Sequence, residues 1–79
     1  MKAQVIVKLK NGVLDPQGTA IQKSLHSLGY DGVASVRQGK TFDVELNTED
    51  AGKAKELLQQ VSEKLLANMV IEDYEIKIV

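Results

Sequence analysis

The sequence predicts an α+β domain in which two helices cover one face of a four-stranded antiparallel sheet. Residues 2–10 and 73–78 alternate apolar and polar side chains, which is the two-residue period of a strand with one buried face. Residues 16–28, and those between Thr48 and Asn68, instead repeat apolar side chains at helical spacing. With 79 residues the chain has room for one domain, which we expect to span residues 1–79.

The first strand and the first helix have recognisable ends. Asn11-Gly12 predicts a turn that closes the strand. Asp15 can accept hydrogen bonds from the free amides of a helical first turn, and Pro16 suits the first helical position, where no donor is needed. Gly29 predicts the helix end because glycine tolerates a left-handed conformation. The inner stripe of this helix would contain Ile21, Leu25 and Leu28.

Two further strands are expected in the middle of the chain. Val33–Gln38 is compatible with a second strand. Thr41–Asn47 predicts a third more clearly, because apolar and polar residues alternate along it. Gln38-Gly39 between them predicts a tight hairpin turn, since glycine tolerates positive φ. The buried face of the third strand would carry Phe42, Val44 and Leu46.

The second helix and the last strand complete the fold. Thr48 is predicted to cap the helix, with Glu49 and Asp50 placing negative charge in its first turn. Asn68 is the expected stop. The inner stripe would contain Ala54, Leu58, Val61 and Leu65, with Ala51 and Leu57 beside it. The resulting order, strand, helix, strand, strand, helix, strand, predicts a ferredoxin-like βαββαβ fold.

Composition excludes several functional classes. The chain has no cysteine, so it has no disulfide, thiolate nucleophile or cysteine-held zinc. Its net charge is −1 with charges interspersed, which leaves no electrostatic footprint for nucleic acid. No segment approaches the ~20 apolar residues that cross a bilayer. We therefore expect a soluble cytoplasmic protein, and its small size makes oligomerisation or a partner reasonable.

Residues 34–41, ASVRQGKT, fit a loose form of the phosphate-binding loop. Such a loop works because its backbone amides and the helix that follows it favour a phosphate anion. Here Phe42–Leu46 alternates as a strand and cannot be that helix. The segment is therefore interpreted as a hairpin turn flanked by Arg37 and Lys40, which could still contact a partner.

Few other residues suggest chemistry. His26, the only histidine, has no visible orienting partner or further metal ligand at helical spacing, which favours a half-exposed structural or interface residue. The neighbours Glu49-Asp50 and Glu72-Asp73 do not share a face of a helix or strand. Phe42 belongs to an expected core face, which argues against base stacking. No catalytic, cofactor or metal site is predicted.

The stretch GVLDPQG raises a separate question at Gly18. Glycine in a first helical turn costs up to ~1 kcal/mol relative to alanine, so local stability does not require it. Asp15, Gln17 and Gly18 would form an open helix start that another backbone or a polar loop could approach closely. A merely tolerated glycine in a frayed turn is the alternative.

Four segments, spread over the chain in order, carry a resemblance to a known family. They are GVLDPQG (12–18), LHSLGY (25–30), VRQGK (36–40) and EKLLANMVIEDYEI (63–76). The chain closely resembles the PurS family, the small subunit of formylglycinamidine ribonucleotide synthase. It departs from the family pattern at Asn11, where proline is common, and at Met69, where proline or threonine is common. Both positions are expected in loops, so local turn geometry is what these departures affect.

The resemblance implies a non-catalytic role in purine biosynthesis. In that complex a large synthetase subunit uses ATP and magnesium, and a separate glutaminase subunit releases ammonia with a cysteine nucleophile. The small subunit would form a homodimer or homotetramer, join the two larger subunits and support ammonia transfer, with no cofactor of its own. Positions in the matching segments that no core stripe explains are the candidate partner contacts: Asp15, Gln17, Gly18, His26, Tyr30, Arg37 and Lys40.

Two other functional classes stay open on the sequence. Ferredoxin-like domains often bind effectors between protomers, so a small-molecule-binding regulatory module is the main alternative. A dimeric isomerase or monooxygenase would need a cleft with a paired acid and base, which the single His26 does not supply.

Overall fold

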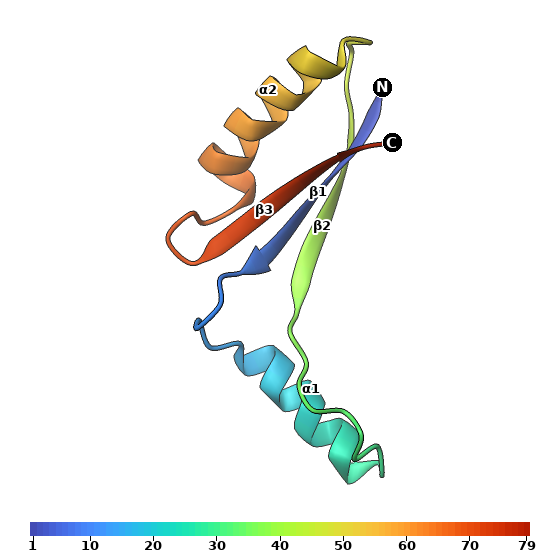
Figure 1. The fold of residues 1–79 in the computed structure, drawn as a ribbon, viewed down its shortest axis with the longest axis vertical. Coiled ribbons are helices and arrows are strands. Elements are labelled where there is room, and N and C mark those ends of the chain that lie inside the picture. The colour runs from blue at the N-terminus through green and yellow to red at the C-terminus, as the bar shows by residue number, and fades with distance from the viewer.

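A computed structural model describes all 79 residues and has a three-stranded sheet, one helix packed on that sheet and one helix that projects beyond it (Figure 1). The first helix begins as predicted, with Asp15 as its cap and Pro16 as its first residue. Gly29 follows with a φ of +96°. The elements are β1 (Lys2–Leu9), α1 (Pro16–Ser27), β2 (Gly39–Glu45), α2 (Ala51–Val61), a π-helical turn η1 (Ser62–Leu66) and β3 (Glu72–Ile78).

The sheet has the order β2-β1-β3, and both pairs of strands are antiparallel. Val5 of β1 lies opposite Phe42 of β2 and Ile76 of β3, so the apolar residues of all three strands share one face. This confirms the predicted alternation in the first, third and last strands. The buried apolar core consists of Ala3, Val5, Val7, Leu46, Ala54, Leu58 and Ala67.

The start of α2 differs from the prediction. Asp50, rather than Thr48, is the capping residue, and its carboxylate accepts the amides of Gly52 at 2.9 Å and Lys53 at 3.2 Å. Thr48 accepts the amide of Asp50 through its hydroxyl at 3.1 Å. The cap therefore moved two residues along the chain because a carboxylate can hold two amides of the first turn.

The end of this helical region departs from regular α-helix. In η1 the hydrogen bond spans five residues instead of the four of an α-helix: the amide of Ala67 donates to the carbonyl of Ser62. The wider turn places Ser62 in the core and leaves the Leu65 side chain 80% exposed. The predicted inner stripe is thus correct at Ala54 and Leu58 and wrong at Leu65.

The predicted four-stranded sheet is wrong. Residues 33–38 form no strand; they run beside α1 and pass straight into β2, without a hairpin at Gln38-Gly39. The expected turn needed a positive φ, and Gly39 does not have one. Gly39 instead pairs with Lys8 as the first residue of β2. Since the fourth strand is missing, α1 has no sheet to cover and only α2 packs on the sheet face.

We call α1 together with residues 28–38 the arm. Figure 1 shows the arm beyond the end of the sheet, with its returning segment alongside the helix. The chain is consequently long and thin, with extents of 48 × 25 × 14 Å. None of its helices has both the length and the apolar character needed to cross a membrane.

Candidate functional site

A group of polar contacts joins the arm to residues 10–15, the connection between β1 and α1, and we call Asp15, Gly18, Arg37 and Gln38 the junction. Asp15 is 8% exposed. One of its carboxylate oxygens accepts the Gly18 amide at 2.9 Å, and the other accepts the Gln38 amide at 2.6 Å. The same side chain therefore caps α1 and holds the segment that returns to β2.

These contacts favour the ionised form of Asp15. The Gln38 amide and then the Gly18 amide lower the pKa of the Asp15 carboxyl below its ordinary value. Desolvation opposes this shift, and the positive charge of Arg37 adds to it. At neutral pH the junction thus contains a fixed negative charge whose hydrogen bonds are charge-assisted.

Arg37 supplies the second half of the junction. Its guanidinium donates from Nη1 to the Val13 carbonyl at 3.0 Å and from Nη2 to the Lys10 carbonyl at 3.1 Å. Lys10 is itself held to the loop before β3, because its amide donates to the Ile71 carbonyl at 2.8 Å. Arg37 therefore ties the returning segment to the connection between β1 and α1.

The role of Gly18 is steric. A Cβ atom at this position would overlap the Val36 carbonyl oxygen and would lie 2.9 Å from a carboxylate oxygen of Asp15. The close approach expected at this helix start therefore occurs, and the approaching backbone is the chain's own residues 36–38. Such a contact requires glycine.

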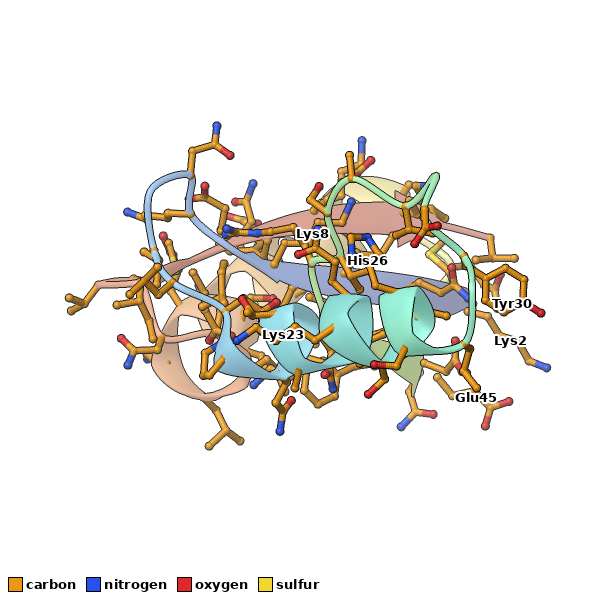
Figure 2. The ribbon with its side chains drawn as sticks, turned by 90° about the horizontal axis from the view of Figure 1, so that it is seen from below. Lys2, Lys8, Lys23, His26, Tyr30 and Glu45 are labelled. Atoms are coloured by element: carbon orange, nitrogen blue, oxygen red, sulfur yellow. The ribbon has the colours of Figure 1, made fainter.

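Along the arm, side chains of α1 hold the returning segment through its carbonyl groups. The Gln22 side chain donates to the Ala34 carbonyl, and Nε2 of His26 lies 2.8 Å from the Val33 carbonyl oxygen. Figure 2 shows His26 on the side of α1 toward residues 30–38, and Tyr30 beyond the C-terminal end of the helix. The Tyr30 side chain is 61% exposed.

Gln17 and Lys40 lie on the open side of the junction. They line a shallow cavity of about 210 Å³ together with Asp15 and Glu72. The Lys40 ammonium is 4.0 Å from the Glu72 carboxylate and 5.7 Å from the centre of the Phe42 ring. Both Gln17 and Lys40 remain accessible to a partner.

The arm also exposes apolar side chains, wholly or in part. Ile21 of α1 and Leu28, which caps the C-terminal end of α1, are seven positions apart and so lie on one side of the arm. Their exposed fractions are 41% and 72%, and Leu14 beside the helix start is 88% exposed. With Tyr30, these side chains form what we call the arm stripe: Leu14, Ile21, Leu28 and Tyr30.

The structure thus divides the seven predicted contact residues into two groups. Asp15, Gly18, Arg37, His26 and Lys40 have partners inside the chain, whereas no hydrogen bond or ion pair within the chain involves the exposed side chains of Gln17 and Tyr30. The sequence interpretation missed Gln22, although it follows Gly18 by four positions and so shares its helix face. It also missed Leu14, although an apolar residue directly before a helix cap is a recognisable signal in a sequence.

Two kinds of site were considered in the sequence, a metal site and a phosphate-binding loop. No three histidine, aspartate or glutamate side chains lie close enough to hold a metal ion. Residues 39–45 form β2, which confirms the strand predicted in place of the helix that follows a phosphate-binding loop. What the chain presents is a shaped surface.

Comparison with known proteins gives this surface its context. A model of the PurS family, described as phosphoribosylformylglycinamidine (FGAM) synthase, matches residues 2–79. The PurS subunit of that synthase from Methanocaldococcus jannaschii is 48% identical over 77 residues, which cover 98% of this chain and 93% of that protein. The Bacillus subtilis PurS subunit is also 48% identical, over 92% of this chain and 86% of its own length.

Solved structures agree with the sequence matches. The crystal structure of M. jannaschii PurS has a TM-score of 0.87 at 49% identity and covers 96% of this chain and 92% of that chain. A chain in the structure of PurLQS from Thermotoga maritima has a TM-score of 0.88 at 33% identity, covering 96% and 93%. The match extends over both sheet and arm, and this chain belongs to the PurS family of FGAM synthase subunits.

Proposed function

We propose that this chain joins the synthetase and glutaminase subunits of FGAM synthase and supports the transfer of ammonia between them. The complex would convert formylglycinamide ribonucleotide to formylglycinamidine ribonucleotide with ATP and glutamine. The observation that carries the proposal is the match, along nearly the whole chain, to a chain in PurLQS from T. maritima. ATP and magnesium would be used on the larger synthetase subunit.

The shape of the chain supports a role in assembly. Its radius of gyration is 16.0 Å, whereas a compact domain of this length would have about 12 Å. Seven apolar residues form the buried core, but ten large apolar side chains are exposed. A chain with so much uncovered apolar surface is expected to bury it against other chains.

Self-association is part of the proposal. A homodimer or homotetramer would cover the arm stripe, and the outer edges of β2 and β3 are unpaired in the single chain. We also place the protein in the cytoplasm, because its ribonucleotide substrates would be charged molecules that do not cross membranes.

Reconstitution tests the function directly. Purified synthetase and glutaminase are mixed with and without this chain, and turnover is measured first with glutamine and then with ammonium chloride. Glutamine-supported turnover should require the chain, whereas ammonia-supported turnover should depend on it much less. Equal glutamine-driven rates in its absence would falsify the proposal.

A further inference from the structure

The junction lies where the arm leaves the sheet (Figure 1). Asp15 joins the start of α1 to Gln38, and Arg37 joins the same returning segment to the carbonyls of Val13 and Lys10. Three separate stretches of chain thus meet within hydrogen-bonding distance: residues 10–15, the first turn of α1 and residues 36–38. Figure 1 shows these stretches between the sheet and α1.

These stretches pack closely against one another. Gly18 has room for a hydrogen only, because the Val36 carbonyl stands where a Cβ would be. The 2.6 Å bond from the Gln38 amide to Asp15 is at the short end of the range, as expected when the acceptor is charged. A tilt of α1 relative to residues 36–38 would break this bond or cause a steric clash.

No second contact of this kind braces the arm. The remaining side-chain bonds from α1 to distant residues, those of Gln22 and His26, end on Ala34 and Val33. These bonds hold the arm together but do not fix how it leaves the sheet. The sheet and α2 form their own core, to which α1 contributes no buried apolar side chain.

We infer that Asp15 and Arg37 are positioning residues for assembly of the synthase: they lock the arm at a fixed direction so that arm and sheet meet the larger subunits as one rigid surface. The inference rests on the proposed function. Without the lock, the complex would have to order the arm when it forms, and this ordering weakens binding. The chemistry on the larger subunits would be unchanged once the complex is saturated.

The direction of the arm can be measured by spin labelling, since the chain contains no cysteine that would compete for the label. Ser27→Cys at the end of α1 and Gln60→Cys on α2 are both exposed positions. The doubly labelled protein is diluted with unlabelled protein, and the distance distribution is recorded by pulsed electron paramagnetic resonance. We expect one narrow distribution, which broadens in Asp15→Ala and in Arg37→Ala.

A matched control separates the lock from ordinary helix capping. Asp50 caps α2 through two amides of its first turn, as Asp15 caps α1 through Gly18, but Asp50 bonds no distant segment. Asp50→Ala should therefore leave the distance distribution narrow. Gly18→Ala, which removes no charge, should broaden it.

The functional readout is glutamine-supported turnover against the concentration of this chain. Asp15→Ala and Arg37→Ala should raise the half-saturating concentration about tenfold with the same plateau. Arg37→Lys should give a value between those of the alanine variants and the wild type.

A distance distribution that stays narrow in both alanine variants overturns the inference, as does a broad distribution with an unchanged half-saturating concentration. An equal effect of Asp50→Ala also overturns it. If the wild-type chain supports no turnover, the proposed function fails, while the distance measurement still decides the lock.

Discussion

The backbone amide of Gln38 donates a 2.6 Å hydrogen bond to the carboxylate of Asp15, a residue 23 positions earlier in the chain. This bond connects the first turn of α1 to the residue that precedes β2. It is also where an unpredicted feature of the fold, the arm, meets a predicted one, the helix cap.

The Asp15 contacts predict a dependence on acid. Because the folded pKa is lowered, their stabilisation is present above the pKa of the unfolded state and is lost as the pH falls through the folded pKa. In ¹H–¹⁵N NMR titrations the Gly18 and Gln38 amides should move together, with a midpoint below the ordinary pKa of an aspartate. Asp15→Asn should abolish the shared transition, and a midpoint at or above the ordinary value would contradict this account.

Gly18→Ala should destabilise the arm despite the better helix propensity of alanine. The new methyl group would overlap the Val36 carbonyl, and forcing extra atoms into a filled space costs roughly 1–3 kcal/mol. Amide hydrogen exchange in α1 should accelerate accordingly. Gly52→Ala in the first turn of α2 is the control, since its Cβ would meet no backbone atom within 4 Å and only Oδ1 of Asp50 at 3.2 Å. Equal exchange in both variants would argue against the steric role.

Two leucines near the end of the second helix should differ sharply in their effect on stability. Leu58 is 1% exposed and Leu65 is 80% exposed. Leu58→Ala should lower the free energy of unfolding by about 2–5 kcal/mol, as large-to-small core substitutions do. Leu65→Ala should cost less than half as much in urea unfolding at the same protein concentration. A larger loss at Leu65 would mean that the π-helical turn does not face it outward.

Leu28→Lys should weaken self-association through the arm stripe. Burying a leucine side chain contributes about 1.5–3 kcal/mol, so a charge at this position should raise the dissociation constant at least about tenfold. Sedimentation equilibrium measures that constant directly. Ser27→Lys adds the same charge at the neighbouring exposed position and should have little effect. If the two variants dissociate alike, the stripe is not the interface.

Local patterns were enough to predict most of the elements. Alternation located β1 and β3, and the Asp15-Pro16 and Gly29 signals located both ends of α1. The prediction was wrong for residues 33–38, because an extended segment can bond either to a strand or to side chains. Here Gln22, His26 and Asp15 take its backbone groups, and their pairing depends on contacts between residues far apart in sequence.

The candidate site was also predictable only where a local pattern indicated it. Gly18 stood out because helix propensity alone could not explain it, and the structure supplies the reason in the Val36 carbonyl. The wide turn at residues 62–66 had no such signal. Nothing in the apolar spacing indicated that Ser62 would be buried and Leu65 exposed.

The elongated outline of the chain has a practical effect on how its mass is measured. A particle 48 Å long and 14 Å thick experiences more friction than a sphere of equal mass. Its Stokes radius is therefore large, and a gel-filtration column calibrated with globular standards would overstate its size. Light scattering, which reports mass without assuming a shape, is the suitable way to count the copies in an assembly.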